Sequence, residues 1–365
     1  MKVLIDEKIP FIRQAAECLF DEVAYLPGDG FAGSAELADA DALVIRTRTR
    51  CDGSLLSGSR VRFVATATIG FDHIDTAFMR RAGIGWANCP GCNAASVAQY
   101  VRNAILELTQ PLSPYPSLRG EGASPVTGVR QGAGGLLLGI VGYGHVGREV
   151  RKAVEAIGCE VLLNDPPLVE GGASPACFVS LETIARRCDV ITFHTPLTAG
   201  GSHPTFHLAD DSFFGSLGRR PVIVNAARGG VVDERALLRA FDRGLVGAMV
   251  IDTWEGEPVI DRELLARSFI ATPHIAGYSA DGKCNATRMA LQAVCRHFGI
   301  TIGDRERFLA LTAPPPLPPE MQPCGDPVRD ALALYDPLAD TARLKAEPSA
   351  FEALRGDYPV RRESF

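Results

Sequence analysis

The sequence predicts an α/β protein with two doubly wound parallel-sheet domains and a small C-terminal α or α+β segment. Short β-rich runs alternate with helical patterns along most of the chain, which is typical of parallel α/β architecture. These runs fall into two series that are separated by a stretch rich in Pro, Gly and Ser. The chain has 365 residues, of which 46% are hydrophobic and 22% charged, so it can form two sizeable cores.

The first series occupies the N-terminal quarter of the chain. Its strand candidates are "KVLID", "ALVIRT", "RFVATA" and "GIGWAN", and its helical candidates are "FIRQAAECLF" and "TAFMRRAG". The following stretch, residues 111–135, is dense in Pro, Gly and Ser and predicts a loop.

The second series contains six strand candidates, the number that a complete dinucleotide-binding sheet uses. They are "GLLLGIVG", "CEVLLND", "DVITFHT", "PVIVNAA", "GAMVIDT" and "SFIATPH". A second Pro-rich stretch, "APPPLPPEMQPCGDP", then precedes a tail whose sequence predicts short helices with turns. Because the tail is too small for a large core, we expect it to pack on the body or on another subunit.

A glycine-rich turn follows the first strand of the second series. In "GIVGYGHVGREV", Gly142, Gly144 and Gly147 have the G-x-G-x-x-G spacing between a strand and a helix. Such a turn brings backbone N–H groups close to a pyrophosphate, so we expect the whole loop, with His145 and Val146, to bind a dinucleotide. Asp165 ends the next strand at the distance expected for a carboxylate that binds the ribose hydroxyls. The residues after Asp165 offer no cation for a 2′-phosphate, so the pattern favours NAD over NADP.

Three later stretches carry polar residues at strand ends: "NAARGGVVDERAL", "IDTWEGEP" and "ATPHIAGYS". His274 suits proton transfer because imidazole titrates near neutral pH, and Glu257 could orient and stabilise its charged form. Arg228 can bind a carboxylate through two donors. Each residue alone has a structural alternative, namely a solvated Arg, a Glu that ends a strand, and a His in a turn.

These motifs, in this order and at these distances, resemble those of the D-2-hydroxyacid dehydrogenase family over residues 1–298. The resemblance implies a flavodoxin-like substrate domain, a Rossmann NAD domain, and Arg228, Glu257 and His274 as the catalytic set. It further implies NAD contacts at Asp165, Thr195, Ala226, Ala227, Arg228, Asp252 and Gly277, and substrate contacts at Thr47, Thr68 and Tyr278. Arg46 and Arg48 are candidate cations for a substrate phosphate.

Several further phrases resemble one branch of that family, among them "GCNAASVAQYV", "GYSADGK" and the tail "FEALRGDYPVRRE". This resemblance implies oxidation of a phosphorylated 2-hydroxy acid, 4-phospho-D-erythronate, in pyridoxal 5′-phosphate biosynthesis. It also implies a homodimer. We therefore expect a substrate domain of residues 1–98 and 277–300, an NAD domain of residues 99–276, and a dimerisation segment of residues 301–365.

Two alternatives stay open at this point. Another D-2-hydroxy acid, such as 3-phosphoglycerate, would use the same chemistry and differ only in the shape of the pocket. A non-catalytic NAD-sensing corepressor with this fold could retain the Arg–Glu–His set.

Composition and cysteine usage exclude other classes. The net charge of −6 disfavours a nucleic-acid partner, and no apolar run approaches a membrane span. Ten cysteines spread along the chain predict a cytoplasmic protein with reduced thiols. Cys89 and Cys92 have C-x-x-C spacing, but no second pair could complete a metal site, so we expect a Pro-Gly turn there and no bound metal.

Overall fold

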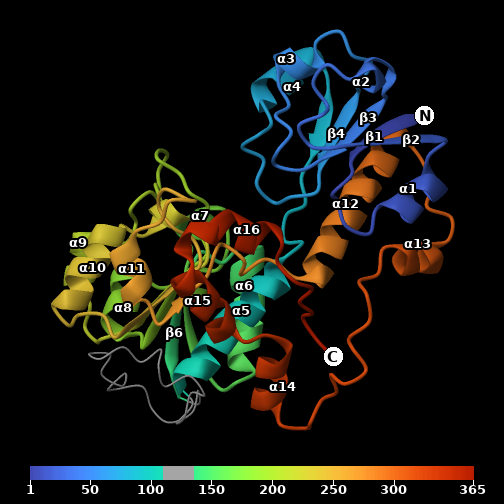
Figure 1. The fold of residues 1–365 in the computed structure, drawn as a ribbon. Coiled ribbons are helices and arrows are strands. Elements are labelled where there is room, and N and C mark those ends of the chain that lie inside the picture. The colour runs from blue at the N-terminus through green and yellow to red at the C-terminus, as the bar shows by residue number, and fades with distance from the viewer. Residues whose placement is uncertain (110–134) are drawn as a thin grey trace. The chain divides into compact units, whose positions relative to one another are not determined.

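The computed structural model describes residues 1–109 and 135–365, so the loop predicted for residues 111–135 lies outside the described residues except at Gly135 (Figure 1). The chain forms two compact units. The first consists of Met1–Asn93 and Ser279–Pro318, and the second of Ala94–Tyr278 and Pro319–Phe365. The tail expected as one segment, residues 301–365, is thus divided between the two units.

The first unit contains a five-stranded parallel sheet in the order β2-β1-β3-β4-β5, which is the flavodoxin-like order. Its strands are β1 (Lys2–Asp6), β2 (Glu22–Leu26), β3 (Ala42–Ile45), β4 (Phe63–Thr66) and β5 (Gly85–Ala87). Successive side chains of β1 point to opposite faces. Val3 and Ile5 enter one apolar core, and Leu4 enters the other.

Helices cover both faces of this sheet, as the sequence predicted. On the face of Val3 and Ile5 lie α1 (Arg13–Leu19), α12 (Ala280–Phe298) and α13 (Arg305–Leu311). On the face of Leu4 lie α2 (Ala35–Asp39), α3 (Gly53–Leu56) and α4 (Thr76–Ala82).

One strand of the first unit was not predicted. β2, "EVAYL", lies at the edge of the sheet, pairs only with β1, and is partly exposed along its length. An edge strand of this kind lacks the continuous apolar run that identified the central strands. The other four strand predictions and both helix predictions are confirmed.

The second unit contains a six-stranded parallel sheet in the order β11-β10-β9-β8-β6-β7. All six predicted strands are present: β6 (Leu137–Val141), β7 (Glu160–Asn164), β8 (Val190–Phe193), β9 (Val222–Asn225), β10 (Ala248–Ile251) and β11 (Ile270–Ala271). The chain leaves β6 towards β7 on one side and returns as β8 on the other side. The carboxyl ends of β6 and β8 therefore form the switch point where open α/β sheets bind nucleotides.

Helices pack on both faces of this sheet as well. α5 (Ala94–Thr109) and α6 (His145–Glu155) contribute to the core on one face. α8 (Leu181–Arg187), α9 (Asp211–Gly215), α10 (Glu234–Asp242) and α11 (Arg262–Arg267) contribute to the core on the other. The short α7 (Pro166–Glu170) begins directly after Asp165, whose side chain caps it.

The C-terminal residues of the second unit form α14 (Pro327–Leu334), α15 (Pro337–Ala346) and α16 (Phe351–Gly356), with no strand among residues 301–365. Leu344 and Phe351 are buried in the same core as Ala271 of β11. The hydroxyl of Thr341 accepts the N–H of Ala271 at 3.1 Å. The tail thus packs on the body of the protein, as expected for a segment without a core of its own.

Candidate active site

His274 and Glu257 form a closely paired acid–base couple in the second unit. Nδ1 of His274 lies 2.8 Å from Oε2 and 3.1 Å from Oε1 of Glu257. The backbone N–H of Trp254 donates to Oε1 of Glu257 at 2.9 Å, which helps to fix the position of the carboxylate. Because Nδ1 contacts the carboxylate, Nε2 is the ring nitrogen through which His274 could contact a ligand.

The Glu257 carboxyl is largely buried, which on its own would raise its pKa. The hydrogen bond and charge of His274, the N–H of Trp254 and the charge of Arg355 outweigh that effect and lower the pKa below its usual value. Glu257 is therefore ionised at neutral pH, as a group that stabilises a charged imidazole must be.

The backbone of His274 is in the left-handed region, with φ at 57°. Its N–H donates to the carbonyl of Asp252 at 2.8 Å. The Asp252 carboxylate is buried and accepts the N–H groups of Ile275 at 2.7 Å and Ala276 at 3.0 Å, together with the hydroxyl of Thr272 at 2.7 Å. The surroundings thus hold a strained residue in place, which is typical of functional positions.

Asp252 thus has a role that sequence reasoning did not assign to it. Its side chain is only 1% exposed and supports the loop that carries His274. Burial raises the pKa of the Asp252 carboxyl, against the lowering effects of His274 and the three donors. The expected NAD contact of Asp252 stays a prediction.

Arg228 lies in a turn that follows β9, and its side chain is exposed. The side-chain amide of Asn225 organises this turn, because Nδ2 donates to the Arg228 carbonyl at 3.0 Å and Oδ1 accepts the Ala227 N–H at 3.2 Å. A Cβ on Gly229 would lie 2.0 Å from the carbonyl oxygen of Trp254, so only glycine lets this turn pack on the Glu257 loop. Sequence reasoning missed Asn225, although its place at a strand end was a signal.

The glycine loop has the shape of a phosphate-binding turn. Gly142 has a φ of 95°, and a Cβ on Gly147 would lie 2.2 Å from the Gly142 carbonyl oxygen. By contrast, a Cβ on Gly144 would meet nothing within 4 Å, so this is the open side of the turn. His145 and Val146 begin α6, and Gly144 is its N-cap, so the first turn of this helix has the N–H groups that can bind an anion.

Two other predicted cofactor residues follow β7 and β8, the strands on either side of β6. Asp165 follows β7, and its carboxylate accepts the N–H of Tyr143 at 2.7 Å and of Leu168 at 3.0 Å. Thr195 follows β8, and its Oγ1 is one of the few buried side-chain polar atoms that lack a partner within the described residues. A buried hydroxyl without a partner fits a site that a dinucleotide completes.

Two predicted substrate residues, Thr47 and Thr68, belong to the first unit. Thr47 is exposed after β3, whereas the Thr68 hydroxyl bonds to Thr66 at 2.6 Å and donates to the Gly70 carbonyl at 2.8 Å. Arg46 pairs through Nε with the fully buried Asp6 at 3.1 Å, which indicates a structural role. Arg48 is exposed.

The C-x-x-C segment forms a turn, as the sequence predicted. The N–H of Cys92 donates to the Cys89 carbonyl at 3.3 Å, and Gly91 has a φ of 78°. Burial raises the pKa of the Cys89 thiol to about 12, so it is not a reactive thiolate. All ten cysteines lie in described residues and none forms a disulfide.

The described residues contain neither a cluster of metal ligands nor a membrane-spanning helix. No group of His, Cys, Asp or Glu side chains within residues 1–109 and 135–365 has the geometry to hold a metal ion. In the same ranges no helix combines the length and the apolar character needed to cross a bilayer.

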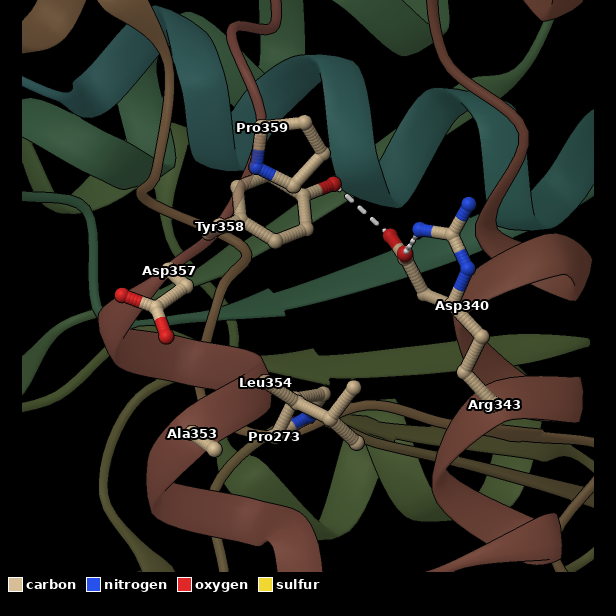
Figure 2. A pocket seen from close by; sticks show the side chains of 8 residues that line it. All are labelled: Pro273, Asp340, Arg343, Ala353, Leu354, Asp357, Tyr358 and Pro359. Atoms are coloured by element: carbon tan, nitrogen blue, oxygen red, sulfur yellow. Dashed lines mark hydrogen bonds and ion pairs between the residues drawn. The ribbon is translucent and has the colours of Figure 1, made fainter.

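A separate pocket of about 360 Å³ lies beside Pro273, the neighbour of His274. Figure 2 shows the remaining lining, which comes from α15, α16 and the residues that follow α16, with the Tyr358 hydroxyl pointing at Asp340, to which it donates at 2.7 Å. None of the predicted catalytic, cofactor or substrate residues lines this pocket, so it is not the candidate active site.

A parallel-sheet domain with a dinucleotide-binding turn, in one chain with a second parallel-sheet domain, defines the class of NAD-dependent dehydrogenases. Residues 118–276 match the model of the D-isomer specific 2-hydroxyacid dehydrogenase NAD-binding domain. The protein is therefore an enzyme of this class, and its cofactor is NAD.

Relatives named erythronate-4-phosphate dehydrogenase align with the entire chain. The protein from Bacteroides thetaiotaomicron is 49% identical over 363 residues, which cover 100% of this chain and 97% of the relative. Those from Porphyromonas gingivalis and Escherichia coli are 41% and 38% identical, with 94% and 92% of their lengths covered. The chain belongs to the erythronate-4-phosphate dehydrogenase family.

Solved structures agree with the class. A D-lactate dehydrogenase from Aquifex aeolicus, complexed with NAD and lactic acid, has a TM-score of 0.62 and 26% identity, covering 82% of this chain and 96% of that protein. A D-mandelate dehydrogenase from Rhodotorula graminis has a TM-score of 0.67 at 23% identity, covering 81% and 93%, and shows the fold alone.

Proposed function

We propose that this enzyme oxidises 4-phospho-D-erythronate at C2 with NAD, giving 3-hydroxy-2-oxo-4-phosphooxybutanoate for pyridoxal 5′-phosphate biosynthesis. The observation that carries the proposal is the 49% identity, over the whole chain, to a protein named for this activity. The paired His274 and Glu257 provide the acid–base chemistry that such an oxidation needs.

The local geometry supports the following catalytic roles. NAD, when bound, accepts the hydride that leaves C2. Neutral His274 takes the proton of the 2-hydroxyl at Nε2, so the C–H and O–H bonds break as the C=O double bond forms. Ionised Glu257 stabilises the imidazolium that results, through its contacts with Nδ1. The exposed Arg228 binds the substrate carboxylate and polarises the developing carbonyl.

The NAD-binding residues that we propose share the carboxyl ends of the strands of the second unit. The open side of the glycine turn receives the pyrophosphate, and the Asp165 carboxylate receives the ribose hydroxyls. The full set is Gly142, Gly144, His145, Val146, Gly147, Asp165, Thr195, Ala226, Ala227, Arg228, Asp252 and Gly277. For the substrate we propose contacts with Thr47, Thr68 and Tyr278.

A homodimer and a cytoplasmic location belong to the same proposal. The dimer rests on the resemblance of the tail to a dimerisation segment, and light scattering of the purified protein tests it. The cytoplasmic location is supported by ten cysteines without a disulfide.

An absorbance assay at 340 nm with a panel of 2-hydroxy acids tests the substrate. We expect NADH formation with 4-phospho-D-erythronate at a kcat/KM far above that with 3-phosphoglycerate or D-lactate. A preference for either of the other acids would replace the proposed substrate. If NAD binds and no acid is turned over, the protein is an NAD sensor and the proposal is wrong.

A further inference from the structure

An arginine of the C-terminal helix α16 reaches the candidate catalytic residues. Nε of Arg355 donates to the hydroxyl of Tyr278 at 3.2 Å, and its terminal nitrogen lies 3.7 Å from Oε2 of Glu257. The Arg355 side chain is 30% exposed and the Glu257 side chain 19%, so water only partly screens the pair. The same oxygen, Oε2, is the one that lies 2.8 Å from Nδ1 of His274.

The chain that follows α16 is fixed to the loop behind His274. Arg361 is 4% exposed and donates to the backbone carbonyls of Ile275 at 3.3 Å and Ala276 at 2.7 Å. It also donates to the carbonyl of Ser96 at 3.0 Å. Because these partners are backbone groups, Arg361 fixes the position of α16 relative to the His274 loop, and with it the reach of Arg355.

The charges around Glu257 show how a cation stabilises its ionised carboxylate. The charges of His274 and Arg355 lower the pKa of the Glu257 carboxyl, whereas the charge of Glu257 raises the pKa of the nearby Glu234 carboxyl. His274 is neutral when it accepts a proton, so Arg355 is the permanent positive charge beside Glu257. It also contacts Tyr278, which the family resemblance implies as a substrate contact.

We propose that Arg355 is a positioning residue, which holds Glu257 and Tyr278 in the arrangement needed for proton transfer at His274. The C-terminal segment is then part of the catalytic machinery of its own chain, in addition to any role in dimerisation. This inference rests on the proposed function, because it assigns Glu257 to the catalytic step.

A double-mutant cycle tests whether Arg355 acts through Glu257. We expect Arg355→Ala to lower kcat about tenfold, the equivalent of one pKa unit of differential stabilisation. The KM for the hydroxy acid should rise less than kcat falls, since Arg355 also contacts the proposed substrate residue Tyr278, and the Kd for NAD should change little. In the Glu257→Gln background the same substitution should cost almost nothing, since the group that it orients is already neutral. Arg355→Lys, or guanidinium ion added to Arg355→Ala, should restore part of kcat.

Arg329→Ala is the matched control, because Arg329 lies in α14 of the same tail with 82% of its side chain exposed. Thermal unfolding of every variant shows whether the fold is retained. If Arg355→Ala proves unstable, Arg355→Lys and Arg355→Met replace it in the cycle. Three results would each overturn the inference. The first is that the effects of Arg355→Ala and Glu257→Gln on kcat are additive. The others are that Arg355→Ala keeps the kcat of Arg329→Ala, or that it changes only KM.

A readout without turnover separates this inference from the proposed function. Infrared difference spectra against Glu257→Gln report the titration of the Glu257 carboxyl, whose pKa should be higher in Arg355→Ala than in the unaltered protein. If no hydroxy acid is oxidised, the proposed function fails, while this titration still decides the inference. An unchanged Glu257 titration would overturn it in an active enzyme as well.

Discussion

Glu257 contacts Nδ1 of His274 with both carboxylate oxygens, at 2.8 and 3.1 Å, and one of these oxygens also accepts the N–H of Trp254. The backbone thus fixes the carboxylate, and the carboxylate fixes the imidazole. The pair resembles the His–carboxylate pairs of hydrolases, in which the carboxylate orients the imidazole and stabilises its charged form.

Replacing Glu257 by Gln should lower kcat by roughly 10²-fold, because an amide cannot stabilise an imidazolium as a carboxylate does. Steady-state kinetics at 340 nm measure the effect, and isothermal titration should show an unchanged Kd for NAD. Glu255→Gln is the matched control from the same motif. Glu255 pairs with His207 at 2.8 Å and not with His274, so its variant should keep kcat. Equal losses in the two variants would contradict the assignment of Glu257.

Alanine substitutions at Gly144 and Gly147 should affect different properties of the protein. Gly147→Ala places a Cβ 2.2 Å from the Gly142 carbonyl oxygen, so it should destabilise the protein by about 1–3 kcal/mol even without NAD. Gly144→Ala meets nothing in the protein, so it should leave thermal stability unchanged but weaken NAD binding. Melting temperatures with and without NAD distinguish the two. Normal NAD stabilisation of Gly144→Ala would argue against a pyrophosphate at that position.

Glu234 should make stability depend on pH. Burial, followed by the charges of neighbouring carboxylates, raises the pKa of Glu234 from 4.5 to about 8, against the N–H of Glu255. A raised pKa means that the folded state holds a proton which the unfolded state releases. Glu234 therefore favours the folded state at low pH, and this contribution is lost as pH rises from about 4.5 to about 8.

Glu234→Gln removes this titration and keeps an oxygen that can accept the Glu255 N–H. The melting temperature of the variant, relative to the unaltered protein, should therefore increase steadily across that pH interval. A difference that stays constant with pH would show that Glu234 is ionised in the folded protein.

In the folded protein, thiol reagents should react slowly with Cys89 of the C-x-x-C turn. Cys18, Cys177 and Cys324 are exposed, whereas Cys89 is buried and the pKa of its thiol is raised to about 12. At neutral pH, iodoacetamide followed by peptide mass spectrometry should show alkylation of the three exposed cysteines first. Rapid labelling of Cys89 would instead show that this thiol is accessible and reactive in the folded protein.

Local patterns predicted the sheets well because buried parallel strands give nearly continuous apolar runs. The edge strand β2 lacks such a run, and for that reason it was not predicted. Short motifs also predicted the contact between His274 and Glu257, which the structure contains. The support of this pair by Arg355 and Arg361 depends on contacts between residues about 80–100 positions apart, which no local pattern records.

The central claim is that His274 is the base of the reaction, and His274→Ala tests it most directly. With 4-phospho-D-erythronate and saturating NAD, kcat should fall by about 10²–10⁴-fold, the usual contribution of a positioned acid–base group. The Kd for NAD and the melting temperature should stay close to those of the unaltered enzyme. Turnover near that of the unaltered enzyme would contradict the account.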